Sequence, residues 1–253
     1  MHSLAIAGVV FIATFGGAML GMLLQRLIPE SHLLNESKEV IRIGSGLIAT
    51  MAALVLGLLV GGAKSSFDAH ESGFRQLAVD LQVLDRTLAQ YGPAANPARE
   101  QLQQLMAVVI DGLWPEDPSQ SVRISDARIT DIGTKMYDVV RALSPTDESQ
   151  TQLKGQAVQL YAQLARDRWS LSHQTDNSLP LPFLTVLAFW FFVLFISFGL
   201  LGPRNMTAVL VLLICGLSVA GAVFLIVDLS QPLDGLLRVS SNSMRNALVS
   251  MGQ

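Results

Sequence analysis

Four long apolar segments dominate the pattern of the chain. They cover Leu4–Leu24, Ile43–Ala63, Leu181–Leu201 and Thr207–Val227, and none of them contains a charged side chain. Each is about 21 residues long, and a helix needs about 20 apolar residues to cross the hydrocarbon core of a bilayer. Because the backbone must satisfy its own hydrogen bonds there, each segment is predicted to be a helix. The sequence therefore predicts four transmembrane helices.

Charge is concentrated between the second and third apolar segments, in residues 64–180. This part holds 15 of the 20 acidic and 11 of the 17 basic residues. Its first apolar positions recur three and four residues apart, as in a heptad seam. The seam consists of Phe67, His70, Phe74, Leu77, Leu81, Leu84, Leu88 and Tyr91. No breaker separates it from the second apolar segment, so one helix is expected to run through both.

Three further amphipathic helices are predicted after this seam, separated by Gly92-Pro93, Trp114-Pro115 and Pro145. Asn96 is expected to cap the first of them, because Pro97 follows it. Four amphipathic helices can bury a common core as a bundle. The predicted fold class is an all-α integral membrane protein with a helical bundle inserted between transmembrane helices two and three.

The predicted domain organisation has four parts. They are transmembrane helices one and two in 1–63, the extramembrane bundle in 64–180, transmembrane helices three and four in 181–227, and a C-terminal tail in 228–253. An even number of spans places the bundle and both termini on one side. Basic residues near the membrane favour a cytoplasmic bundle, although loop charge is nearly balanced.

Composition narrows the possible functions. Only 15% of the residues are charged, against about 25% in a soluble domain. The net charge of −3 argues against a nucleic-acid binder. Cys215 is the single cysteine, and the four histidines share no ligand spacing. Motifs of hydrolases, metalloproteases and phosphate-binding loops are missing. We therefore predict no catalytic residue, cofactor or metal site, and no enzyme.

The second transmembrane helix is the strongest candidate for the wall of a conduit. Its small and hydroxyl-bearing residues suit a pore, although they suit tight helix packing equally well. The candidate pore-lining residues are Ser45, Thr50, Lys64, Phe67, His70 and Phe74. A ring of Lys64 would favour anions, whereas rings of Asp68 or Glu71 would favour cations. The GxxxG pairs Gly17–Gly21 and Gly57–Gly61 indicate close helix contacts, either within one chain or between chains.

His70 is the polar residue in an otherwise apolar seam. It is either a buried core residue or a member of a titratable ring around a symmetry axis. In the second case, like-charge repulsion would make the assembly respond to acidification to about pH 5–6.

Several short motifs lie at or near the ends of the predicted helices. They are Ser66-Phe67-Asp68, Asp85-Arg86, Gly92-Pro93, Trp114-Pro115, Pro203-Arg204-Asn205, and Asp228 followed by Pro232 and Gly235. Together they resemble the bestrophin-like domain family of bacterial membrane proteins, over about residues 40–240. The family name implies kinship with bestrophins, which are pentameric anion channels with four spans per subunit and a helical cytosolic domain.

Two features depart from the bestrophin pattern. Bestrophins bind calcium through an acidic cluster after the last span, where this chain has only Asp228 and Asp234. They also carry a ring of phenylalanines on the second span, and Ile43–Ala63 contains no aromatic residue. The resemblance therefore implies neither calcium gating nor an aromatic neck for this chain.

The residues and the resemblance together predict a homo-oligomeric ion channel or channel-like protein, pentameric by analogy with bestrophins. Its partners would be the lipid bilayer, further copies of the chain and ions, and an anion would be the conducted species. The alternative is a non-conducting membrane sensor or scaffold whose helical domain binds a partner protein.

Overall fold

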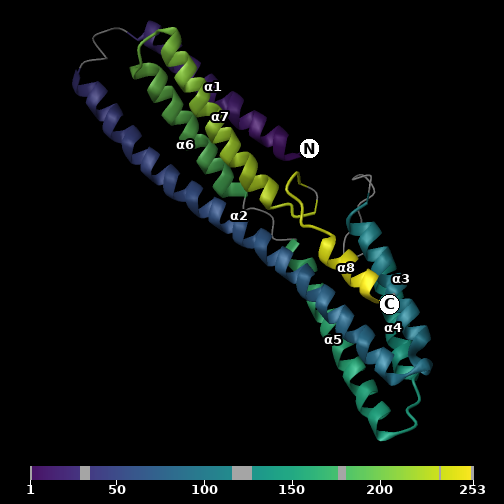
Figure 1. The fold of residues 1–253 in the computed structure, drawn as a ribbon. Helices are drawn as coiled ribbons and strands as arrows, with labels where there is room; N and C mark the ends of the chain where they lie inside the picture. Colours follow the sequence, from purple (N-terminus) through teal and green to yellow (C-terminus); the bar gives the residue numbers. More distant parts are fainter. Residues whose placement is uncertain (1, 29–34, 116–126, 176–180, 234, 252–253) are drawn as a thin grey trace. The chain divides into compact units, whose positions relative to one another are not determined.

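The computed structural model describes residues 2–28, 35–115, 127–175, 181–233 and 235–251 (Figure 1). Within these residues every regular element is helical. The elements are α1 (His2–Leu27), α2 (Asn35–Tyr91), the 3-10 turn η2 (Pro93–Ala95), α3 (Asn96–Leu113), α4 (Ala127–Ala142), α5 (Glu148–Thr175), α6 (Leu181–Leu201), α7 (Met206–Leu229) and α8 (Asn242–Met251). Four of them, α1, α2, α6 and α7, are long and apolar enough to span a membrane. This confirms the prediction of an all-α protein with four candidate transmembrane helices.

The chain divides into two compact units. The first contains Met1–Ser66, Ser178–Gln231 and Gly235–Leu237, and the second contains Phe67–Asn177, Pro232–Asp234 and Arg238–Gln253. Helix α2 is continuous over 57 residues and contributes its first part to one unit and its second part to the other. The expectation of one helix running through the apolar segment and the heptad seam is therefore confirmed.

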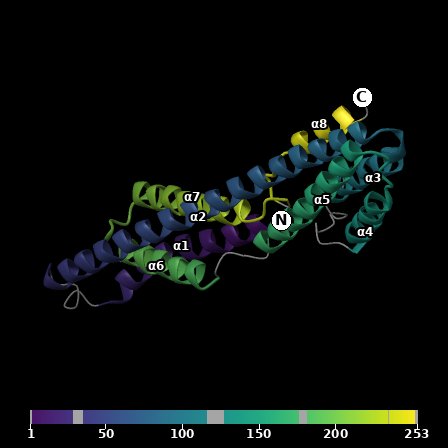
Figure 2. The ribbon, with the colours of Figure 1, turned by 90° about the horizontal axis from the view of Figure 1, so that it is seen from below.

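In the first unit, α1 lies alongside α6 and α7 (Figures 1 and 2). Helices α1 and α6 approach each other closely because a glycine on each helix lies against the backbone of the other. A Cβ on Gly21 would collide with the carbonyl oxygen of Ile196, and one on Gly199 would collide with that of Ala18. The Gly17–Gly21 pair thus serves packing within the chain, which small residues permit in a membrane helix pair.

The second unit is built around an apolar core. The heptad seam of α2 supplies Phe74, Leu77, Leu81, Leu84, Leu88 and Tyr91 to this core, and all of them are buried. Helices α3, α4, α5 and α8 contribute the remaining side chains, among them Leu102, Met106, Met136 and Met244. Burial of such side chains provides the main driving force for folding of the unit.

One local expectation was wrong. Asn96 is not the N-cap of α3, because it has helical backbone angles and follows the 3-10 turn directly, which makes Ala95 the cap residue. The segment after the last span contains a further helix, α8. This helix buries Met244, Ala247 and Met251 in the core of the second unit.

Candidate functional site

The membrane-spanning part of α2 packs against little else in the subunit. Only 6% of its most apolar window is buried, compared with 22–33% for α1, α6 and α7. One side of α2 is covered, where Ala52 packs with Leu187 and Leu194 of α6. Large apolar side chains such as Leu47, Leu54 and Leu58 are more than 60% exposed. Most of this helix therefore faces outward from its own subunit.

A row of small residues runs along the uncovered surface of α2. We call it the small-residue stripe, and it consists of Gly46, Thr50, Ala53, Gly57 and Gly61, all of them exposed. Their spacings of three and four residues place them on one helix face. A Cβ at Gly46, Gly57 or Gly61 would meet nothing within 4 Å. Thr50 Oγ1 donates to the carbonyl oxygen of Gly46 at 2.9 Å, so the hydroxyl is satisfied within the helix.

Basic residues bracket this stripe. Arg42 precedes it, Lys64 follows it, and no charged residue lies between the two. The Arg42 guanidinium is exposed and lies 3.9 Å from the Glu39 carboxylate. The two charges attract each other weakly, because the contact is long and surrounded by solvent. Beyond Lys64, the same spacing continues through Asp68, Glu71 and Arg75. At each end of the stripe, the charge nearest to it is therefore positive.

The six candidate pore-lining residues do not share one face of α2. Thr50 lies in the stripe and Lys64 continues it, and both are exposed. Ser45 is half-buried, and its hydroxyl donates to the Arg42 carbonyl oxygen at 3.0 Å. Phe67 packs partly against the core of the second unit.

His70 and Phe74 are buried inside the subunit. They are 2% and 3% exposed, and the Phe74 ring meets the Trp114 ring edge-on, with centroids 5.2 Å apart. Gly73 lies between them in sequence and faces Leu171 of α5 closely enough that a Cβ would press on its side chain. The heptad seam is therefore a packing face, distinct from the stripe.

Motif residues in the second unit have structural partners. The Asp85 carboxylate is held by the Arg99 guanidinium, whereas Arg86 is exposed. Gly92 has φ +108°, a backbone conformation that residues with a Cβ rarely adopt, and Pro93 then begins η2. Trp114 Nε1 donates to the Val239 carbonyl oxygen at 2.8 Å.

The remaining motif residues mark helix ends or lie within α2. Ser66, Phe67 and Asp68 lie within α2, Pro115 follows the end of α3, and Pro203 lies between α6 and α7. Asn205 is the N-cap of α7, where its Oδ1 accepts from the Ala208 amide at 2.8 Å. The Pro232 carbonyl oxygen accepts from the Val239 amide at 2.9 Å.

Asp228 lies in the last turn of α7 and is completely buried. Its Oδ1 accepts from the Ser3 hydroxyl at 3.1 Å and from the Leu236 amide at 3.0 Å, and its Oδ2 accepts from the Leu237 amide at 2.8 Å. Gly235 lies so close that a Cβ there would be 2.9 Å from Asp228 Oδ1. The carboxylate thus ties the start of α1 to the segment after α7.

This arrangement does not fit the calcium site of bestrophins. A calcium ion needs several oxygen ligands with free lone pairs, and the Asp228 oxygens face hydrogen-bond donors of the protein itself. The other acidic candidate, Asp234, lies outside the described residues. Asp228 is best described as a structural carboxylate.

Sequence reasoning missed two parts of this picture. It treated the uncharged second span as one undivided surface, although the spacing of Gly46, Thr50, Ala53 and Gly57 already marks a face. It also missed the role of the C-terminal segment, which the spacing of Met244, Ala247 and Met251 could have signalled.

Comparison with known proteins gives a consistent result. The sequence matches the Bestrophin-like domain over residues 12–244. The fold is similar to a crystal structure of a bacterial bestrophin homologue variant from Klebsiella pneumoniae, with TM-score 0.71, 14% identity, and coverage of 100% of this chain and 99% of that chain. A second variant from Klebsiella pneumoniae has TM-score 0.66 and 16% identity, with coverage of 94% and 98%. A structure described as a membrane protein has TM-score 0.64 and 15% identity, with coverage of 95% and 99%.

No curated protein matches the sequence. At these identities the structural likeness establishes the fold, while the domain match covers most of the chain. The chain belongs to the bestrophin-like family.

Proposed function

We propose that this protein is a homo-oligomeric ion channel whose conduit is lined by the small-residue stripe of α2. The observation that carries the proposal is the exposure of Gly46, Thr50, Ala53 and Gly57 on a helix that its own subunit leaves uncovered. A single subunit has one such face and cannot enclose a path, so several copies around an axis are required.

The chemistry of the stripe suits a wall that ions pass. Its residues are small and uncharged, so water can approach the backbone and the Thr50 hydroxyl without meeting an ionised side chain. A face turned towards lipid would gain from large apolar side chains, and α2 carries these elsewhere, at Leu47, Leu54 and Leu58. The two surfaces of α2 therefore suit two surroundings, a conduit for the stripe and lipid or a neighbouring subunit for the leucines.

Anions are the conducted species in this proposal. Arg42 and Lys64 are the charges nearest to the two ends of the stripe. Rings of basic residues attract anions and repel cations at a pore mouth. The acidic side chains Asp68 and Glu71 lie farther along the helix, and the Glu71 carboxylate is paired with Arg75 Nη2 at 2.8 Å.

Family membership supports the assembly and its setting. Bestrophins are pentameric anion channels, so five copies is the stoichiometry we propose. The bundle formed by the second part of α2 and by α3, α4 and α5 would lie in the cytoplasm, with the spans in the bacterial inner membrane. His70 and Phe74 are left out of the proposed lining because both are buried in the subunit.

Reconstitution of the purified protein into planar bilayers tests the proposal. A chloride gradient at constant potassium should shift the reversal potential towards the chloride equilibrium potential, and Lys64→Gln should reduce that shift. Native mass spectrometry should count five copies. A correctly folded oligomer that passes no current under any ion, voltage or pH would contradict the proposal and favour a scaffold with a partner protein.

A further inference from the structure

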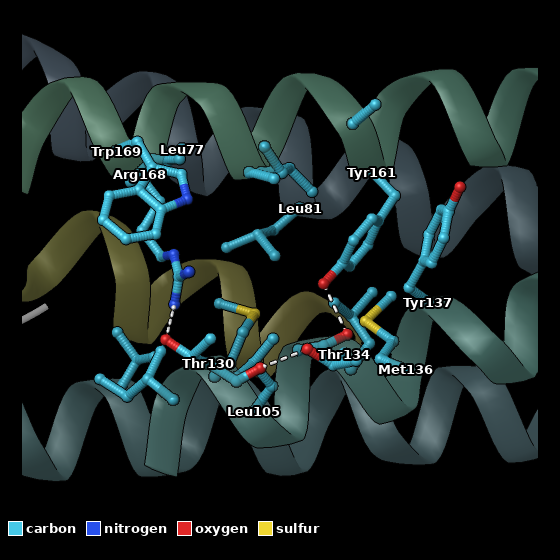
Figure 3. A pocket seen from close by; sticks show the side chains of 18 of the residues that line it. Leu77, Leu81, Leu105, Thr130, Thr134, Met136, Tyr137, Tyr161, Arg168 and Trp169 are labelled. Atoms are coloured by element: carbon cyan, nitrogen blue, oxygen red, sulfur yellow. Dashed lines mark hydrogen bonds between the residues drawn. The ribbon is translucent and has the colours of Figure 1, made fainter. Parts of the chain in front are cut away.

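The second unit contains a cavity of about 460 Å³ between α2, α3, α4, α5 and α8 (Figure 3). Its walls are mainly aliphatic and methionine side chains, including Leu81, Leu105, Met106, Met136, Leu164 and Met244. Protein interiors are close-packed and rarely leave voids larger than a water molecule. The volume instead falls in the range of about 300–1,000 Å³ that is usual for small-molecule sites.

In the described part of the lining, Arg168 is the one charged residue. Its Nη1 donates to Thr130 Oγ1 at 3.2 Å, and its guanidinium lies 5.4 Å from the centre of the Trp169 ring. Among the residues that the structure describes, no carboxylate pairs with it. A guanidinium has five N–H donors in a planar fork that matches a carboxylate, so donors remain available for an anion.

The other polar groups of the lining carry no charge. The Tyr161 hydroxyl donates to the Gly133 carbonyl oxygen. Burial raises the pKa of Tyr161 against the opposing effect of Arg168, so the phenol stays protonated at neutral pH. The Tyr137 ring lies against Tyr161, with centroids 5.2 Å apart. The cavity therefore combines an apolar interior with one cation.

We propose that this cavity binds a single-chain amphiphile with an anionic head, namely a fatty acid. The carboxylate pairs with Arg168, and the alkyl chain lies among the leucines and methionines. A volume of about 460 Å³ suits one alkyl chain of medium length and is too small for the two full-length chains of a bilayer phospholipid. Charge complementarity selects the acid over an uncharged chain of the same length.

Trp169 provides the readout because it lines the cavity beside Arg168. The experiment uses the whole chain with the substitution Trp190→Phe, which removes the tryptophan of membrane helix α6. This variant is titrated in detergent with dodecanoate that carries bromine next to its carboxylate. Bromine quenches a nearby indole, so saturable loss of tryptophan emission is expected. Adding Trp169→Phe should abolish the saturable part.

Arg168→Gln should raise the half-saturating concentration of the acid about tenfold or more, as expected for loss of a charge-assisted hydrogen bond. Arg166→Gln is the matched control, because it removes the same charge two residues away, outside the lining. The methyl ester of the same probe should bind equally weakly to both variants and to the parent.

If Arg168→Gln misfolds, Ala165→Phe fills the cavity instead and should abolish saturable quenching by the acid. Equal titration curves for acid and ester would overturn the proposal, and so would the absence of quenching at Trp169. The measurement needs no ion current, so it stands or falls separately from the proposed channel activity.

Discussion

The Asp85 carboxylate of α2 accepts two hydrogen bonds from Arg99 of α3, at 2.8 Å from Nε and 2.9 Å from Nη2. The pair closes the turn at Gly92 and also reaches α8, since Arg99 Nη2 lies 3.4 Å and Gln103 Nε2 2.9 Å from the Met251 carbonyl oxygen. The hydrogen bond to Asp85 raises the pKa of Arg99 in spite of its partial burial. One buried acid thus joins three helices of the second unit.

Asp85→Asn should destabilise the second unit by about 2 kcal/mol, because the partly buried Arg99 guanidinium loses its two charge-assisted hydrogen bonds. Chemical denaturation of the purified protein, followed by tryptophan emission, measures the loss. Asp131→Asn is the control, since its pair with Lys135 is exposed and should contribute little. Equal effects of the two substitutions would contradict the assigned role of the Asp85–Arg99 pair.

Asp228→Ala should destabilise the first unit by about 2–4 kcal/mol. The substitution leaves the buried Ser3 hydroxyl and the partly buried amides of Leu236 and Leu237 without their acceptor. Asp228→Asn keeps one acceptor oxygen and should be milder. Thermal unfolding in detergent, with and without calcium, is the measurement. A large stabilisation by calcium in the parent, lost in Asp228→Asn, would show that the carboxylate binds metal after all.

The two GxxxG pairs should respond differently to substitution. Gly21→Ala forces a Cβ against the Ile196 backbone and should lower the melting temperature of the subunit itself. Gly57→Ala meets open space within the subunit and should leave subunit stability unchanged. Gly57→Leu should then alter current or subunit number, as native mass spectrometry can show. A stability loss at Gly57→Ala equal to that at Gly21→Ala would contradict the distinction.

The spans and the packing seam could be read from the sequence because each rests on a local pattern. Segments without charged residues predict the helices that end near Leu24 and Val227. The spacing of apolar residues by three and four predicts that Phe74 and Leu84 are buried, as they are. The spacing of Gly46, Thr50, Ala53 and Gly57 marks one face of α2 in the sequence, but only the structure shows that α6 covers a different face and leaves this one exposed. The pairing of Asp85 with Arg99 likewise depends on the turn at Gly92.

The pH response of the second unit should follow Tyr161 in the alkaline range. Burial is the main cause of the raised pKa of Tyr161, and an unfolded tyrosine titrates near pH ~10. The folded state therefore holds its proton longer, so stability is unaffected below about pH 10 and falls as pH rises through the folded pKa. Tyr161→Phe should flatten this fall. The same dependence of unfolding free energy on pH in the parent and in Tyr161→Phe would contradict this prediction.

Cysteine accessibility along α2 tests the central claim most directly. In a Cys215→Ser background, single substitutions Thr50→Cys and Gly57→Cys place a thiol on the stripe, and Met51→Cys and Leu58→Cys place one on the exposed surface that flanks it, about 100° around the helix. A charged, membrane-impermeant thiol reagent is added while current is recorded. The account predicts that current through the first two variants is blocked and that current through the last two is not. Block at Met51→Cys and Leu58→Cys, with none at Thr50→Cys and Gly57→Cys, would contradict it.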